Sequence, residues 1–338
     1  GKGTRMASCK PKALQTLAGR TLIEHILGTL SEANINDVVI IVSPEAKNDF
    51  KKRIETKNKV KYVEQEEAMG TAHALKTALP HLSVDNLLVL LGDVPLLSKH
   101  TINKLKEKTL DNDLVVLTGK VKNPSGYGRI IKDKHGKPMA IIEELDCNEA
   151  QREIKEINSG IMAFKTNAAK NLVERIKPSL KKNEYYLTDA IEIAYHEGLD
   201  SGTYSTSEEE VFGVNSKRDL AEAEKINRKN VTNKLMENGV TIIDPERVDV
   251  RGTLSCGQNV TIDVNTLFIG DVTLGDNVTI APFTIISNST IGDGTTILSH
   301  SNIEEADIGS RCNIGPFARI RPQTKLEEGV KIGNFVET

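Results

Sequence analysis

The chain has 338 residues, a formal net charge of -3 and a hydrophobic fraction of 38%. This length can support two hydrophobic cores, and the slight negative charge argues against a general nucleic-acid-binding protein, because no excess positive field attracts a polyanion. No apolar run approaches the roughly 20 residues that a membrane helix needs, so no membrane association is expected. Cys9, Cys147, Cys256 and Cys312 form no Cys-x-x-Cys pair, which predicts free thiols in a reducing cytoplasm.

The chain begins with a glycine-rich turn, Gly1 to Thr4, followed by Arg5, Lys10 and Lys12. Consecutive backbone N–H groups beside cations can bind a phosphate group. No Gly-Lys-Ser/Thr ends the turn, so the pattern differs from a Walker loop, and its spacing alone leaves an ordinary glycine turn with solvated cations as an equal alternative. Because such a turn normally follows a buried strand, we expect the parent protein to have a strand before Gly1.

In the first two-thirds of the chain, short apolar runs alternate with amphipathic stretches. Residues 37–43, 59–65 and 86–93 are predicted strands, and residues 71–79 and 101–108 are predicted helices. Strands that alternate with helices indicate parallel strands in an α/β layered domain, whose ligands bind beyond the carboxyl ends of the strands. A first helix is predicted in residues 21–30, whose apolar face consists of Leu22, Ile23, Ile26, Leu27 and Leu30.

From about Val248 the apolar residues recur every six positions. This period matches neither an α-helix nor an isolated alternating strand, and it is typical of a parallel β-helix with three flat sides. Five-residue steps follow Ile286 and Ile303. The inward register is Ile262, Phe268, Leu274, Ile280, Ile286, Ile291, Ile297, Ile303, Ile308, Ile314, Ile320, Leu326 and Ile332, and small or β-branched residues two positions earlier form a second register.

The two regions are joined by a predicted helix. Ser216 is a candidate N-cap with Asp219 at the N3 position, an apolar stripe follows, and Gly239 ends the pattern. The predicted organisation is therefore a domain in residues 1–215, a linker helix in 216–238 and a β-helix in 239–338.

Asp93 ends the strongest predicted strand and is followed by Pro95. A carboxylate at this place suits a divalent cation such as Mg²⁺, which takes one or two protein oxygens together with phosphates, although a turn or N-cap aspartate would look the same. The seven histidines are dispersed and no Ser–His–acid arrangement is apparent. The sequence therefore favours a reaction whose nucleophile is already ionised, and which needs positioning and charge neutralisation.

The stretches GKGTRM, KPKAL, EQEEAMGTAHAL, LLGDVPLL, PSGYGRI, EINSGI, EYYLTDAI and GVNS together resemble the sugar-phosphate nucleotidyltransferases. Followed by DPERVDVRGTL and the hexapeptides up to IGPFARIRPQTKLEEGVKIGNFVE, they resemble a bifunctional bacterial branch of that family. The resemblance covers essentially the whole chain. It implies transfer of a uridylyl group from UTP to N-acetylglucosamine 1-phosphate, and in the complete protein acetylation of glucosamine 1-phosphate by acetyl-CoA.

The resemblance also implies roles for individual residues, carried over by position. Arg5 and Lys12 would be catalytic cations, and Asp93 and Asn215 would bind Mg²⁺. Arg321 would contact glucosamine phosphate in the acetyltransferase. The nucleotide would bind Gly1, Lys2, Gly3, Thr4, Gln65, Gly70 and Thr71, and the sugar phosphate would bind Gly128, Glu143, Asn158, Tyr186 and Thr188.

The implied fold is a Rossmann-like α/β nucleotidyltransferase domain with a mixed sheet, followed by a left-handed parallel β-helix that is truncated here. The family's first strand precedes Gly1 and is absent. The family's histidine base, the lysine that follows it and the rest of the acetyl-CoA pocket would come after Thr338, so we expect no acetyltransferase activity from this chain. The homotrimer expected along the β-helix of the complete protein would be weakened.

Two alternatives remain at this point. One is another nucleotidyltransferase with the same two-domain plan, making ADP-glucose or dTDP-glucose, although MGTAHA and EINSGI favour the uridylyl transfer. The other is a non-catalytic scaffold like the translation-factor exchange subunits, which share the domain pairing. Such a scaffold would be expected to lack the set of Arg5, Lys12, Asp93 and Asn215, which this sequence retains.

Overall fold

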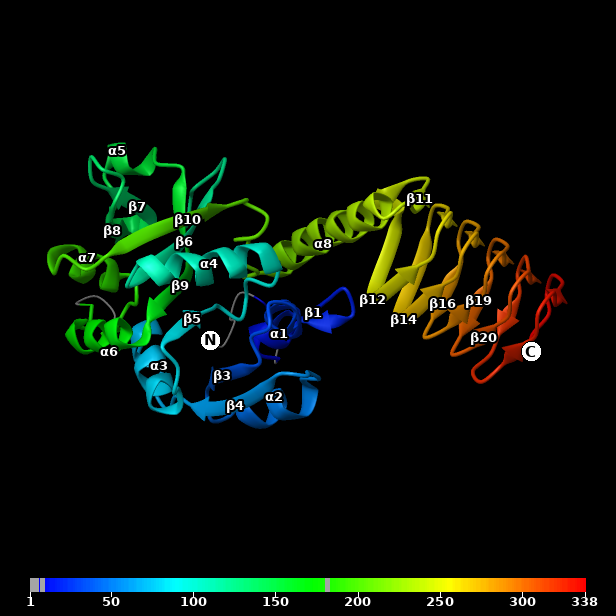
Figure 1. Cartoon of the computed structure of the whole chain (residues 1–338), viewed down its shortest axis with the longest axis horizontal. Helices are drawn as coiled ribbons and strands as arrows, with labels where there is room; N and C mark the ends of the chain where they lie inside the picture. Colours follow the sequence, from blue (N-terminus) through cyan, green and yellow to red (C-terminus); the bar gives the residue numbers. More distant parts are fainter. Residues whose placement is uncertain (1–5, 7–9, 180–182) are drawn as a thin grey trace. The chain divides into compact units, whose positions relative to one another are not determined.

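The computed structural model describes Met6, residues 10–179 and residues 183–338. It divides into two compact units (Figure 1), one of residues 1–15 and 21–216 and the other of residues 16–20 and 217–338. The predicted phosphate-binding residues Gly1 to Arg5, and also Cys9, lie outside the described residues. None of the helices in the described part of the chain is both long and apolar enough to cross a lipid bilayer.

The helices of the first unit follow the predicted apolar pattern. Helix α1 (Leu22–Glu32) begins with a capping box, in which Thr21 accepts a bond from the Glu24 N–H and the Glu24 carboxylate accepts one of 2.7 Å from the Thr21 N–H. All five predicted apolar residues of this helix are buried. The other helices are α2 (Lys47–Arg53), α3 (Thr71–Ala78), α4 (Lys99–Asp111), α5 (Glu149–Arg152), α6 (Thr166–Arg175) and α7 (Asp189–His196), with 3₁₀ turns η2 (Lys12–Leu14), η3 (Leu79–His81) and η4 (Glu144–Asp146).

The strands of the first unit form a parallel pair and a six-stranded mixed sheet. Strand β3 (Asp37–Val42) pairs with β4 (Lys59–Glu64). The larger sheet has the order β10-β6-β9-β7-β8, and β5 also pairs with β9. Alternation alone predicted parallel strands, yet β9 runs antiparallel to β5, β6 and β7, because the residue pattern of a buried strand carries no direction. Its strands are β5 (Asn86–Val89), β6 (Leu114–Lys120), β7 (Arg129–Lys132), β8 (Pro138–Ile142), β9 (Glu156–Lys165) and β10 (Ser201–Thr206).

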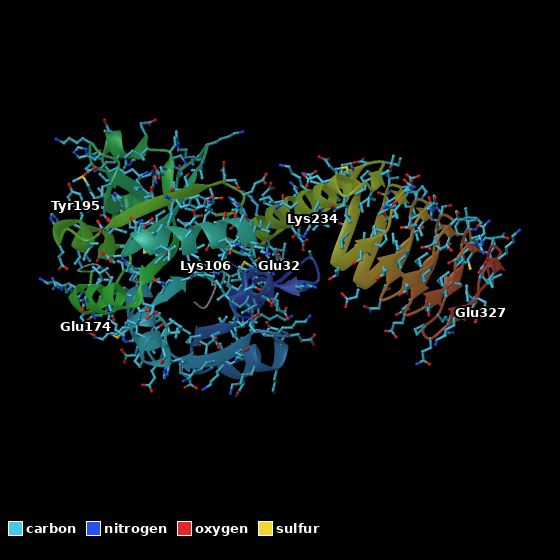
Figure 2. The ribbon with its side chains drawn as sticks, in the orientation of Figure 1. Glu32, Lys106, Glu174, Tyr195, Lys234 and Glu327 are labelled. Atoms are coloured by element: carbon cyan, nitrogen blue, oxygen red, sulfur yellow. The ribbon has the colours of Figure 1, made fainter. Side chains whose placement is uncertain are left out.

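Helices cover both faces of this sheet, which makes the unit an α/β layered domain (Figure 1). In β6, Val115 and Leu117 pack in one core with Ile102 and Leu105 of α4. Leu114 and Val116 point to the other core, which contains residues of α3, α6 and α7. Charged residues occupy the outer helix surfaces, as for Glu174 of α6 (Figure 2), which pairs with Lys76 of α3 at 2.7 Å.

The second unit contains helix α8 (Lys217–Glu237) and a stack of short parallel strands. Strands β1 (Thr16–Leu17) and β2 (Arg20–Thr21) form a hairpin. The Ala18 N–H donates to the Glu224 carboxylate of α8 at 2.9 Å, and Arg20 donates to Thr253 at 2.9 Å, so this hairpin packs with the second unit although it lies near the start of the chain.

The parallel strands confirm the hexapeptide prediction. Thr261 pairs with Thr279 eighteen positions later, and Thr279 pairs with Thr296 seventeen positions later, so each coil holds three hexapeptides or loses one residue at a five-residue step. The strands are β11 (Thr241–Ile242), β12 (Val248–Cys256), β13 (Thr261–Ile262), β14 (Thr266–Leu274), β15 (Thr279–Ile280), β16 (Ile285–Ser287), β17 (Thr290–Ile291), β18 (Thr296–Ile297), β19 (Asn302–Glu304), β20 (Asp307–Ile308), β21 (Asn313–Ile314), β22 (Arg319–Ile320), β23 (Lys325–Leu326) and β24 (Lys331–Ile332).

Burial follows the two predicted registers. The inward register from Ile262 to Ile320 is at most 1% exposed, while Leu326 and Ile332 in the last coil are only partly buried. Asparagine occupies several corners in the left-handed backbone region, for example Asn277 with φ of 58°. Asparagine tolerates this conformation better than most residues, which explains its frequency between the short strands.

Candidate active site

Three predicted site residues from distant parts of the chain meet at one point of the first unit. The Lys12 ammonium group forms an ion pair with the Asp93 carboxylate and donates a hydrogen bond of 2.8 Å to Oδ1 of Asn215. The Lys12 and Asp93 side chains are 21% and 19% exposed, so this charged cluster is sheltered but still open to a ligand.

Backbone contacts explain why these residues meet. Asp93 follows β5, and its carbonyl accepts a hydrogen bond of 2.8 Å from the N–H of Val214, which places Asn215 beside it. Turn η2 carries Lys12 and packs against Gly92, where an added Cβ would lie 3.2 Å from the Ala13 Cβ. The glycine therefore permits the close approach that brings the lysine to the end of β5.

The donor atoms at this point fit a magnesium ion. A carboxylate and an amide oxygen are hard ligands, and both already converge on one cationic group, the Lys12 ammonium. Among the described residues there is no group of three or more His, Cys, Asp or Glu side chains able to hold a metal. A cation held by Asp93 and Asn215 would therefore complete its coordination with water and phosphate oxygens, as Mg²⁺ commonly does.

The predicted nucleotide-binding residues Gln65, Gly70 and Thr71 lie between the end of β4 and the start of α3. Gln65 directly follows β4, and its amide nitrogen lies 2.8 Å from Nδ1 of His73 and 3.4 Å from the Gly70 carbonyl. Gly70 has φ of +99°, and a Cβ there would lie 2.5 Å from the carbonyl oxygen of Tyr185. Only glycine fits this place, because the backbones of two segments touch.

This contact joins the stretch with the predicted nucleotide-binding residues to part of the predicted sugar pocket. The Tyr185 N–H donates to Met69 and the Ala72 N–H donates to Tyr185, at 2.8 and 2.9 Å. The Thr71 hydroxyl accepts a hydrogen bond of 2.9 Å from the Leu187 N–H. Thr71 therefore holds the segment that carries the predicted residues Tyr186 and Thr188, and Thr188 immediately precedes α7.

Gly128, Glu143 and Asn158 lie side by side on three neighbouring strands or their ends. Arg129 of β7 is opposite both Ile142 of β8 and Ile157 of β9. Because β7 is antiparallel to both, Gly128 before Arg129 lies beside Glu143 after Ile142 and Asn158 after Ile157. The Asn158 N–H donates to the Gly128 carbonyl at 2.8 Å, and a Cβ on Gly128 would lie 3.4 Å from a Glu143 carboxylate oxygen. Gly128 is buried, and the neighbouring Glu143 is exposed.

An irregularity in β9 aims Asn158 into this place. The pairing of β6 with β9 shifts register between Val116 and Thr118, opposite the SGI part of EINSGI that directly follows Asn158. The Asn158 carboxamide oxygen accepts a bond of 2.9 Å from the Gly160 N–H, which leaves its amino group as a donor. Gly160 has φ of +77°, and its missing side chain leaves room for Leu91, two residues before Asp93. Bulges of this kind commonly redirect side chains beside active sites.

Tyr186 is influenced by the charges of Glu184 and Glu143, which links it to the predicted sugar pocket. Its hydroxyl donates a 2.7 Å hydrogen bond to the Glu184 carboxylate. That hydrogen bond raises the pKa of Tyr186 above its ordinary value, and burial and the negative charges of Glu184 and Glu143 raise this pKa further. Tyr186 therefore stays a neutral hydrogen-bonding group at physiological pH.

Several residues of this site were not singled out from the sequence. His73 contacts Gln65, and the Glu184 carboxylate accepts the hydrogen bond from the Tyr186 hydroxyl. Arg129 and Glu144 form an ion pair of 2.6 Å directly beside Gly128 and Glu143. Arg129 lies within the motif PSGYGRI, but the motif does not reveal the partner of this charge.

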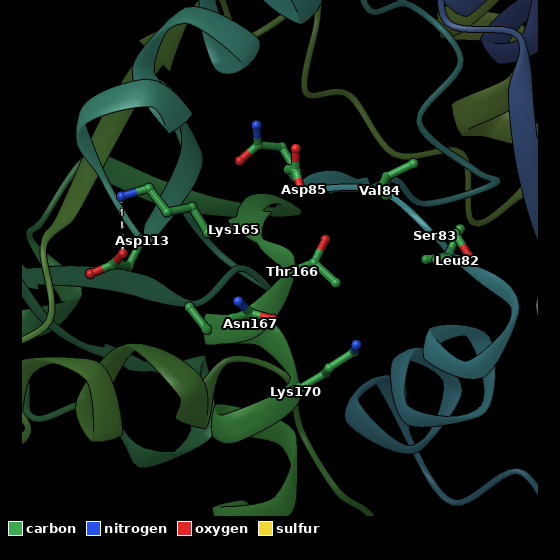
Figure 3. A pocket seen from close by; sticks show the side chains of 11 residues that line it. Leu82, Ser83, Val84, Asp85, Asp113, Lys165, Thr166, Asn167 and Lys170 are labelled. Atoms are coloured by element: carbon green, nitrogen blue, oxygen red, sulfur yellow. Dashed lines mark hydrogen bonds and ion pairs between the residues drawn. The ribbon is translucent and has the colours of Figure 1, made fainter.

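A cavity of about 830 Å³ lies elsewhere in the first unit, at the amino-terminal ends of β5 and α6 (Figure 3). In it Lys165 pairs with Asp113 at 3.2 Å. None of the predicted site residues lines this cavity, and it lies at the opposite end of β5 from Asp93. Ligands of α/β sheets bind beyond the carboxyl ends of the strands, so we do not assign this cavity to the active site.

Arg321 lies in the second unit, just after β22. Its side chain is 58% exposed and pairs with Glu337 at 3.2 Å, and Arg319 approaches the same carboxylate at 3.7 Å.

Comparison with known proteins supports this assignment of the two units. Residues 1–155 match the family model of a MobA-like NTP transferase domain, and residues 250–337 match that of a GMPPB C-terminal domain. The chain is 43% identical over its whole length to the bifunctional protein GlmU of Paraburkholderia phymatum, of which it covers 74%. It is 40% identical to GlmU of Azoarcus sp. and 42% identical to GlmU of Francisella tularensis subsp. novicida, again over its whole length and over 75% and 74% of those proteins.

The chain belongs to the GlmU family. The predicted resemblance to the bifunctional nucleotidyltransferases is thereby confirmed. The NTP transferase model covers the part of the chain that holds Lys12, Asp93, Gly128 and Glu143, whereas Asn158 and Asn215 lie beyond it.

Proposed function

We propose that the chain transfers a uridylyl group from UTP to N-acetylglucosamine 1-phosphate, giving UDP-N-acetylglucosamine and pyrophosphate. The observation that carries the proposal is the meeting of Lys12, Asp93 and Asn215 beyond the end of β5. Membership of the GlmU family and the match to an NTP transferase domain support the same reaction.

The reaction brings two anions together, and the residues of the site suit that task. An oxygen of the sugar phosphate attacks the α-phosphorus of UTP and pyrophosphate leaves, so the nucleophile is ionised at neutral pH and no general base is required. The Lys12 ammonium, and Arg5 by analogy with the family, would neutralise charge that accumulates on the phosphates. Positioning of the two substrates supplies the remaining acceleration.

Mg²⁺ is the cofactor that we propose for this site, with Asp93 and Asn215 as its protein ligands. When bound, the ion would screen the repulsion between the triphosphate and the incoming phosphate. Asp93 and Asn215 are held in place without it by the Val214 backbone bond and by Lys12. This preorganised pair of oxygens is consistent with an ion that arrives together with the nucleotide.

The sugar would bind over Gly128, with Glu143 and Asn158 as hydrogen-bonding partners. The free amino group of the Asn158 carboxamide is a donor, and the Glu143 carboxylate is an acceptor for sugar hydroxyl or amide groups. A site built to pair with such groups rejects analogues that lack them, because its own polar atoms would then be buried without partners. This arrangement supports selection for the N-acetylated sugar over glucose 1-phosphate.

For the second unit we propose the left-handed winding and the homotrimer expected of the complete protein, with Arg321 as a contact for glucosamine phosphate. Exposed aromatic rings along one corner support an assembly role. Phe283 and Phe317 are 49% and 47% exposed and stack on either side of His300, with ring centres 4.9 and 4.8 Å apart.

The test of the proposed reaction is pyrophosphate release from UTP and N-acetylglucosamine 1-phosphate, measured with Mg²⁺ and again with EDTA. dTTP, ATP and glucose 1-phosphate serve as alternative substrates. We expect release that requires Mg²⁺ and that is fastest with the first pair. Faster release with dTTP or ATP would assign the chain to a sister nucleotidyltransferase, and no release with any pair would contradict catalysis.

A further inference from the structure

Beside the proposed sugar site, a buried arginine ties together two loops. The Arg129 side chain is 1% exposed, and it is the largest of the fully buried side chains in the described part of the chain. Its guanidinium donates to the Glu144 carboxylate at 2.6 Å and also to the Tyr127 carbonyl. The same Glu144 oxygen accepts a hydrogen bond of 3.3 Å from the Gly126 N–H.

These contacts link the loop before β7 to the turn after β8. Gly126 and Tyr127 immediately precede Gly128, and Glu144 immediately follows Glu143. The ion pair is therefore one residue away in the chain from Gly128 and from Glu143, both of which belong to the proposed sugar site. The positive charge of Arg129, through the hydrogen bond to Glu144, lowers the pKa of that carboxyl below its ordinary value, so the pair is fully charged at neutral pH.

A role in stability alone does not account well for this pair. Burying the Arg129 guanidinium removes its charge from water, and its attraction to the partly exposed Glu144 carboxylate offsets much of that cost, so the ion pair is weak evidence for net stabilisation. In addition, Arg129 Nε is buried and has no hydrogen-bond partner among the described residues, which is a further cost. What the pair does achieve is a defined geometry, since a guanidinium and a carboxylate meet in few orientations.

We infer that Arg129 and Glu144 are positioning residues that set the distance between Gly128 and Glu143 and thereby the selectivity for the N-acetylated sugar phosphate. This inference rests on the proposed function. In the part of the chain that the structure describes, the hydrogen bonds of Arg129 and Glu144 join them to each other, to Tyr127 and to Gly126, so we expect the pair to act on the sugar and to leave binding of UTP unchanged.

Glu144→Gln and Arg129→Lys test this role. Each keeps the approximate size of the side chain. Glu144→Gln removes the negative charge of the pair, and Arg129→Lys removes the planar guanidinium that reaches Glu144 and the Tyr127 carbonyl together. We expect kcat/KM for N-acetylglucosamine 1-phosphate to fall about tenfold or more, because small misplacements of a binding group have effects of this order. KM for UTP stays unchanged, and the preference for N-acetylglucosamine 1-phosphate over glucose 1-phosphate shrinks.

Asp113→Asn is the matched control. Asp113 likewise pairs with one cation, Lys165, and accepts one backbone N–H, from Asp200, and its side chain is 24% exposed against 31% for Glu144. It lines the cavity remote from the proposed site (Figure 3). We expect this variant to lose a similar amount of thermal stability while both KM values and the sugar preference stay as in the wild type.

The outcomes separate the two proposals. An inactive wild-type chain contradicts the proposed function itself. An active wild type, with Glu144→Gln and Asp113→Asn equally stable and equally selective, overturns the positioning role of the pair. If Glu144→Gln fails to fold, Arg129→Lys, which keeps the positive charge, is measured by calorimetry for sugar-phosphate and UTP binding, and equal weakening of both ligands would also overturn the positioning role.

Discussion

The two units differ in how far apart in the chain their important contacts are. In the β-helix, a residue pairs with the residue 17 or 18 positions later, on the neighbouring coil. In the proposed active site, Lys12 reaches Asp93 across 81 positions and Asn215 across 203. A repeating pattern therefore reveals the first kind of contact, while the second kind depends on the path of the chain through the fold.

The units also use glycine differently. Gly70, Gly92, Gly128 and Gly160 in the first unit each permit one particular close approach beside the proposed site. In the β-helix, Gly257, Gly275, Gly292 and Gly309 occur at equivalent corners, where a Cβ would meet the backbone or a corner aspartate of the next coil. A change at one site glycine should alter activity, while a change in the β-helix should alter stability.

The largest effect should come from the cluster at the end of β5. Asp93→Asn removes the charge of the proposed metal ligand while preserving its shape. We expect kcat for pyrophosphate release to fall by about a hundredfold or more, because charge stabilisation is a leading part of such catalysis. The assay is run over a range of Mg²⁺ concentrations, and more Mg²⁺ should be needed for half-maximal activity. An unchanged rate would remove Asp93 from the active site.

The burial pattern of the β-helix can be tested with two adjacent isoleucines of β16. Ile286 is fully buried and Ile285 is 38% exposed. Ile286→Ala should lower the free energy of unfolding by about 2–5 kcal/mol, the usual cost of removing a buried aliphatic side chain. Ile285→Ala should cost less than about 1 kcal/mol. Urea unfolding followed by circular dichroism measures both, and equal losses would contradict the inward register.

Gly70→Ala should disturb the junction of the nucleotide and sugar segments. Its Cβ would lie 2.5 Å from the Tyr185 carbonyl oxygen, and its φ of +99° strains any other residue. We expect a loss of about 1–3 kcal/mol together with a higher KM for UTP.

Gly28→Ala is the control for Gly70→Ala, since Gly28 lies within α1 with open space around its Cα. Alanine should stabilise this helix by about 0.5–1 kcal/mol and leave both KM values unchanged. Similar effects of the two substitutions on the thermal midpoint would show that the close contact between Gly70 and Tyr185 does not contribute to stability.

The smallest effect concerns Cys256 in the second unit. Burial raises the pKa of this thiol from 9.0 to about 11. At pH 8 the folded protein should therefore carry about a hundredfold less thiolate at Cys256 than the unfolded chain, because each pKa unit is a factor of ten. The folded state holds this proton more tightly, so its contribution to stability is complete below pH 9 and declines as pH rises toward 11.

Alkylation by iodoacetamide, followed by mass spectrometry of the Cys256 peptide, compares the folded protein with the protein in urea. We expect much slower labelling of the folded protein at pH 8. Equal rates in both states would contradict the protection of this thiol.

Periodicity and local chemistry were enough to predict much of the molecule. The five apolar residues of α1 and the six-residue register of the β-helix appear as predicted, and the strands predicted at 37–43 and 59–65 are observed one residue shorter, at Asp37–Val42 and Lys59–Glu64. These features depend on which face of one element is buried, and a residue pattern records that directly. The motif resemblance also predicts site residues that lie close together in the structure, namely Lys12, Asp93 and Asn215, and likewise Gly128 and Asn158.

Only the tertiary structure decided how these residues are combined. The direction of β9, the bulge at Asn158, and the pairing of Arg129 with Glu144 arise from strand order and from loops that meet far along the chain. A sequence pattern carries neither the direction of a buried strand nor the partner of a buried charge, because both depend on what packs against it. The family and the repeating core could therefore be predicted from the sequence. The geometry that would select the sugar depends on how the loops around Gly128 and Glu143 pack.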